Sequence, residues 1–80
     1  MRLTYKTKGT CSQMIELDVE DGIINEVSFL GGCPGNLLAI GILVKGMKVT
    51  DAIAKLEGIK CGNKKTSCAD QLAQALKQTL

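Results

Sequence analysis

The fold of this chain is decided by the stretch QMIELDVEDG, residues 13–22. Its apolar residues Ile15, Leu17 and Val19 alternate with acidic ones, which is the period of a β-strand with one buried face. The final pair, Asp-Gly, is a strong signal for a two-residue hairpin turn, because glycine tolerates the positive φ that such turns need. The stretch therefore predicts a strand that leads through a tight turn into an antiparallel neighbour.

Weaker alternation on either side predicts two further strands. Residues 2–7 are typical of a first strand, and residues 23–30 of a third, with Ile23, Val27 and Phe29 on one face. Three strands that follow one another and share a polar face form an antiparallel meander covered on one side only.

After the third strand the apolar period becomes helical. Residues 36–44 are apolar almost all round, so we expect this helix to be buried between the sheet and either another helix or a second subunit. Thr50 is expected to cap a short helix over 51–56, and a last helix is expected over 68–79. The chain therefore predicts a single α+β domain, residues 1–80, in which three helices pack on one face of a three-stranded meander in the order β-β-β-α-α-α.

Composition excludes several classes of function. Tyr5 and Phe29 are the only aromatic residues and the net charge is +2, so the chain offers neither a base-stacking platform nor a basic stripe for nucleic acid. The longest apolar run, residues 37–44, is too short to span a bilayer, and the N-terminus lacks the apolar segment of a signal peptide. We therefore expect a cytoplasmic protein with no membrane or nucleic-acid partner.

The candidates for chemistry are four cysteines: Cys11, Cys33, Cys61 and Cys68. In a reducing compartment this number favours metal or redox chemistry over disulfides. The chain has no histidine, and no C-x-x-C pair, so the spacing alone is a weak metal signal. The expected layout strengthens it, because the first turn, the end of the third strand, the cationic loop around residue 61 and the start of the last helix can meet at one end of the molecule. Four thiolates would suit Zn²⁺ first, or an iron–sulfur cluster.

Two of the cysteines fall where a helix begins. Pro34 suits a first helical position, which puts Cys33 at or beside the N-cap, and Ser67 with Asp70 has the S-x-x-D spacing of a capping box. A thiolate at a helix N-terminus is favoured by backbone N–H groups and by the helix dipole. The residues expected to support the site are Gly32, Pro34, Gly35, Ser67 and Asp70, and no catalytic residue is assigned.

Other interpretations of the cysteines remain open at this point. The thiols can be redox-active or disulfide-forming, or simply small buried apolar residues. The glycine-rich stretch 31–35 also precedes a helix as phosphate-binding loops do, but it lacks the Lys-Ser/Thr of a P-loop and the G-x-G-x-x-G pattern.

The pentapeptide TSCAD, residues 66–70, resembles the Thr-Ser-Cys-Pro-Asp motif of the TSCPD domain family, and the segments 29–35 and 58–61 are also similar to that family. Ala69 stands where the motif has proline, which removes a pre-set φ but no metal ligand. Members of the family occur as small stand-alone proteins and as tails of adenosylcobalamin-dependent ribonucleotide reductases, where the cysteines are suspected metal ligands. The resemblance implies a metal-binding accessory domain associated with deoxyribonucleotide synthesis, with a reductase or another protein as partner. An 80-residue chain is too small to be a reductase itself.

A fainter resemblance runs to the NifU/IscU iron–sulfur scaffolds. There too a strand ends in Gly-Cys-Gly before an apolar helix, and residues 44–52 resemble the Lys-Gly-Lys-Thr-like stretch that follows. The middle cysteine of those scaffolds has no clear counterpart here. Cluster assembly or delivery therefore remains an alternative, as does a thiol redox partner of a reductase. The apolar helix over 36–45 makes a homodimer a further expectation.

Overall fold

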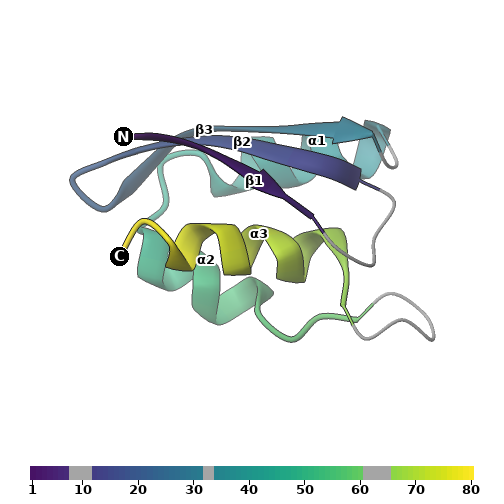
Figure 1. Cartoon of the computed structure of the whole chain (residues 1–80). Helices are drawn as coiled ribbons and strands as arrows, with labels where there is room; N and C mark the ends of the chain where they lie inside the picture. The colour runs from purple at the N-terminus through teal and green to yellow at the C-terminus, as the bar shows by residue number, and fades with distance from the viewer. Residues whose placement is uncertain (8–11, 32–33, 61–65) are drawn as a thin grey trace.

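The computed structural model describes residues 1–7, 12–31, 34–60 and 66–80 (Figure 1). Three strands, β1 (Arg2–Lys6), β2 (Ser12–Glu20) and β3 (Ile23–Gly31), form an antiparallel sheet in the order β1-β2-β3. Three helices follow: α1 (Pro34–Val44), α2 (Val49–Leu56) and α3 (Cys68–Lys77). The α+β order expected from the sequence is confirmed.

The hairpin between β2 and β3 turns at the expected Asp-Gly pair. Asp21 has φ 53° and Gly22 has φ 75°, and two positive values in succession are those of a type I′ turn. This turn matches the right-handed twist of the strands, and it sets Glu20 opposite Ile23 and Val19 opposite Ile24.

A β-bulge next to this turn corrects the expected register of β3. Val19 pairs with Ile24 and Asp18 pairs with Glu26, so Asn25 is an extra residue in β3. One extra residue exchanges the two faces of a strand. Ile24 is therefore completely buried, whereas Ile23, which the sequence placed on one face with Val27 and Phe29, is only half-buried.

The core lies on one face of the sheet. Ile15, Leu17 and Val19 of β2 are buried, while Glu16 and Glu20 between them are exposed, as the alternation predicts. Figure 1 shows α2 and α3 below the sheet, and α3 runs along β2. The buried cluster joins β2 to β3 and to all three helices. Its members outside β2 are Ile24 and Val27 of β3, Val44 of α1, Val49, Ala52 and Ile53 of α2, and Leu72, Ala75 and Leu76 of α3.

Helix α1 packs against β3 on one side only. Leu37 and Val44 are buried, and Gly41 lies so close to the strand that a Cβ there would come within 2.9 Å of the Val27 carbonyl oxygen. On the other side Leu38 and Ile42 are 67% and 65% exposed. The expected burial on more than one side is thus not completed within the single chain. Although α1 is the most apolar helix, no helix among the described residues is long and apolar enough to cross a membrane.

The start of α2 corrects another expectation. Its N-cap is Lys48, whose side chain makes no capping hydrogen bond, and Thr50 lies inside the first turn. The backbone fixes the start instead: the Val49 N–H donates to the Gly22 carbonyl at 2.8 Å, and Lys48 forms a β-bridge with Ile23. Long-range bonds to the hairpin therefore replace the local side-chain cap.

The close approach of α1 to β3 is tested by Gly41→Ala. Alanine favours a helix over glycine by about 1 kcal/mol, yet here its Cβ would press on the Val27 carbonyl. We expect a net loss of about 1–3 kcal/mol in the free energy of unfolding, which is typical of overpacking. The control is Gly35→Ala in the same helix, where nothing lies within 4 Å of the new Cβ. Denaturant titration should show the control unchanged or stabilised, and equal stabilisation of both variants would contradict the packing.

Candidate metal centre

Cys68 is the first residue of α3, and it is half-buried. The residue before it, Ser67, is the N-cap, with extended backbone angles and a hydroxyl that accepts a hydrogen bond from the Asp70 N–H at 3.0 Å. This is the cap that the S-x-x-D spacing predicts. The cap fixes the first turn of α3 and with it the position of the Cys68 backbone.

The Asp70 carboxylate connects α3 to two earlier parts of the chain. Its Oδ1 accepts the Gly58 backbone N–H at 2.8 Å, and its Oδ2 accepts the Thr66 hydroxyl. Gln74 adds a longer bond of 3.4 Å to Oδ1, and Gln71 donates to the Thr66 hydroxyl oxygen at 3.0 Å. The chain just after α2 and the chain just before α3 are thus fastened to the same side chain.

These bonds decide what Asp70 can do. The Thr66 hydroxyl and the Gly58 N–H lower the pKa of the Asp70 carboxyl, against a smaller opposing effect of burial. The carboxylate is therefore charged and has hydrogen-bond donors on both oxygens. Asp70 acts as a structural anchor that fastens the start of α3 to Gly58 and Thr66.

The other three candidate ligands, Cys11, Cys33 and Cys61, lie outside the described residues, as does Gly32. Their described neighbours in the chain can be located. Ser12, next to Cys11, pairs with Gly31, and Pro34 begins α1 as expected. Figure 1 shows that α3 begins at the same end of the molecule at which β2 begins and β3 ends.

Within the part of the chain that is described, no group of three or more His, Cys, Asp or Glu side chains could hold a metal ion. Cys68 is the only one of the four candidate ligands within that part. The four-cysteine site therefore stays a prediction. Gly35, also expected to support it, is exposed in the first turn of α1.

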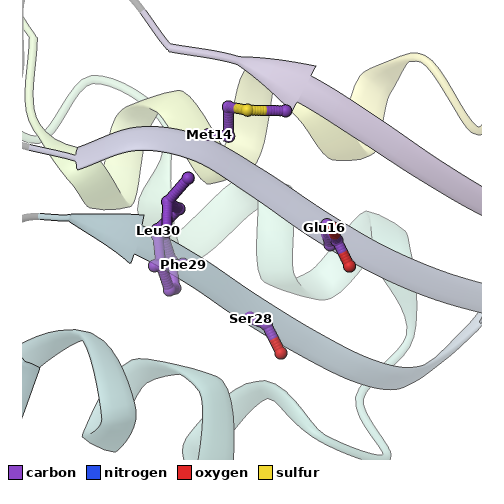
Figure 2. A pocket seen from close by; sticks show the side chains of 5 residues that line it. All are labelled: Met14, Glu16, Ser28, Phe29 and Leu30. Carbon is purple, nitrogen blue, oxygen red and sulfur yellow. The ribbon is translucent and has the colours of Figure 1, made fainter.

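A shallow hollow of about 210 Å³ lies on the sheet face that the helices leave open. Figure 2 shows the side chains that line it, from β2 and β3: Met14, Glu16, Ser28, Phe29 and Leu30. Among the described residues that line it, Glu16 is the only ionisable one, so they provide no pair of carboxylates and no cluster of sulfur ligands. This described lining does not provide the convergent polar groups of a binding site.

Comparison with known families shows the class of protein to which this chain belongs. The sequence pattern of the TSCPD domain matches residues 3–80. The chain therefore belongs to the TSCPD domain family. No significant match was found among curated proteins or among solved structures.

The sequence alone predicted Ser67 and Asp70 as supporting residues but missed two partners in the same network. Thr66 stands directly before the N-cap, and its place in the family motif was the available signal. Gly58 gave no signal for its role, because its N–H reaches Asp70 across 12 residues of chain. Only the packing of α2 on α3 brings the two together.

The anchoring role of Asp70 is tested by Asp70→Asn. The substitution keeps the shape but removes the charge that strengthens the bonds from Gly58 and Thr66, and we expect a loss of about 1–2 kcal/mol in the free energy of unfolding. The control is Asp51→Asn, an exposed aspartate in the first turn of α2, which should change stability by less than about 0.5 kcal/mol. Both aspartates stand in the first turn of a helix. If denaturant titrations showed the same loss of stability for both variants, the helix dipole alone would explain the effect, and the anchoring role of Asp70 would be contradicted.

The lowered pKa of Asp70 also predicts a pH dependence. The pKa in the folded state lies below the unfolded value of about 3.9, so the stabilisation is complete above that value and is lost as pH falls through the folded pKa. The thermal midpoint of the wild type should therefore fall more steeply below about pH 5 than that of Asp70→Asn. Parallel curves for the two proteins would contradict the assignment.

Proposed function

We propose that this chain is a small metal-binding accessory domain in which Cys11, Cys33, Cys61 and Cys68 hold one metal centre. The observation that supports the proposal is that their described neighbours in the chain are joined in two groups, and that β3 ends at the same end of the molecule at which β2 and α3 begin (Figure 1). Ser12 pairs with Gly31, two residues before Cys33, so the segments that lead to Cys11 and Cys33 start side by side. Asp70 likewise fastens Gly58, three residues before Cys61, and Thr66, five residues after it, to the helix that begins with Cys68.

The donor chemistry of this end of the molecule favours thiolate ligation. The chain has no histidine, and the carboxylate nearest to Cys68 in the sequence, Asp70, already accepts hydrogen bonds on both oxygens. Four thiolates form a closed tetrahedral set for Zn²⁺, and the same ligands suit an iron–sulfur cluster. Zn²⁺ is the first choice, because a closed set of four sulfur ligands is typical of structural zinc sites.

The electrostatics of the helix starts support the same proposal. Cys68 stands at the positive end of the α3 dipole, and Cys33 directly precedes Pro34, the first residue of α1. Each dipole stabilises negative charge in the first turn. Lys60 is exposed, and the neighbouring Lys64 and Lys65 add further positive charge to the same sequence segment. These groups would offset the charge of a thiolate cluster.

When bound, the metal would stabilise the fold rather than supply a reaction. An 80-residue chain has a small core, and the binding energy of a structural metal becomes folding energy. The described residues provide an anchored helix start and no general base beside Cys68. We therefore assign the chain an accessory role, by family association alongside a ribonucleotide reductase or another protein in the cytoplasm.

The experiment is metal analysis of protein purified anaerobically without added metal, together with a titration of reactive thiols. We expect about one Zn²⁺ per chain and protected thiols. Each of the four Cys→Ser variants should lose at least about ten-fold in metal affinity, because replacing one thiolate opens the tetrahedral set. The control, Ser28→Ala on the open face of the sheet, should retain the metal.

Two results would overturn this proposal. Metal-free protein with four reactive thiols would exclude the shared site. Loss of metal in only two of the four Cys→Ser variants would replace it with a smaller site or a redox pair. A brown protein that passes its cluster to an acceptor would instead favour the iron–sulfur scaffold alternative.

A further inference from the structure

The side of α1 that faces away from the sheet carries a continuous apolar stripe. Its residues are exposed and follow the helical spacing i, i+3, i+4, i+7 and i+8: Gly35, Leu38, Ala39, Ile42 and Leu43. The three large ones are 67%, 65% and 74% exposed. The opposite side, with Leu37, Gly41 and Val44, already packs on β3. An exposed apolar stripe on an otherwise packed helix is typical of an interaction surface.

The charge of the stripe restricts its partner. Pro34–Val44 contains no charged residue, with no acid in its first turn and no base in its last. Nucleic acid and anionic lipid require cationic side chains, and an acidic or basic peptide would find no counter-charge here. The surface therefore matches a partner that is apolar and neutral over a helix-sized area.

We infer that this partner is a second copy of the same chain, with the two α1 stripes packed against each other. A two-fold contact sets a surface against itself, so a charge near the two-fold axis would lie against the same charge of the second copy, and a neutral stripe avoids this cost. The stripe also combines small with large side chains. Gly35 and Ala39 leave space beside Leu38 and Ile42, which is the relief that ridges-into-grooves packing of two helices needs.

The dimension of the stripe sets the expected strength of the dimer. An 11-residue helix presents a face roughly 16 Å long and 10 Å wide. A standard interface takes about 800 Å² from each partner, roughly a sixth of the 4895 Å² surface of this chain. The stripe is smaller than that, so the dimer should dissociate on dilution to micromolar concentrations.

The test is sedimentation equilibrium of the purified full chain from about one micromolar to one millimolar. It compares the wild type with two alanine-to-glutamate variants. Ala39→Glu places a charge in the centre of the stripe, where the two copies would bring like charges together. The matched control, Ala54→Glu, makes the same change at an exposed alanine of α2. We expect a wild-type dimer, an unchanged control, and a dissociation constant at least about 100-fold higher for Ala39→Glu.

A second measurement uses the wild type alone. In a dilution series followed by amide NMR, the shifts should change along α1 and leave the outer face of α2 unchanged. A wild type that is monomeric at every concentration overturns the inference, as does equal dissociation of the two glutamate variants. Neither result bears on metal content, so this inference and the proposed metal site can fail separately.

Discussion

The structure around Cys68 depends on one carboxylate. Asp70 receives the Gly58 N–H and the Thr66 hydroxyl, while its own N–H is capped by Ser67. These bonds join the exit of α2, the approach to α3 and the first turn of α3. Because α2 and α3 pack on each other below the sheet, the same anchor connects the helix start to the core. Without it the first turn of α3 would keep its N-cap, the Gln71–Thr66 bond and the packing of Ala69, but it would lose its hydrogen bond to the exit of α2.

This network explains most of the motif by which the family is named. Thr66, Ser67 and Asp70 are all used in hydrogen bonds that fix the helix start. Ala69, in the place of the motif's proline, is buried and contributes packing. Cys68 is the motif residue for which we propose a role as metal ligand. The motif thus combines three residues whose hydrogen bonds fix the start of α3 with one cysteine that stands at this start.

Local patterns in the sequence predicted the parts of the fold that local physics decides. The alternation over residues 13–20 and the Asp21-Gly22 turn gave the hairpin, and the S-x-x-D spacing gave the start of α3. The bulge at Asn25 was missed, because an extra residue in β3 is settled by the fit of the strand over the core. The cap at Thr50 was wrong, since backbone bonds to the hairpin start α2 two residues earlier, at Val49. For the candidate site, the sequence predicted that Cys68 lies at the capped start of α3. It could not predict the hydrogen bond from the Gly58 N–H to Asp70, because that bond depends on tertiary packing.

We propose that the fixed start of α3 presents Cys68 to a metal that is held by sulfur alone. X-ray absorption at the zinc edge of the metal-loaded protein tests it most directly, because the distance and type of the first ligands are read from the metal itself. We expect four sulfur neighbours at about 2.3 Å and no nitrogen or oxygen among the ligands. A shell that contains oxygen neighbours at about 2.0 Å would contradict it, since the Asp70 carboxylate or another oxygen donor would then have to replace a thiolate.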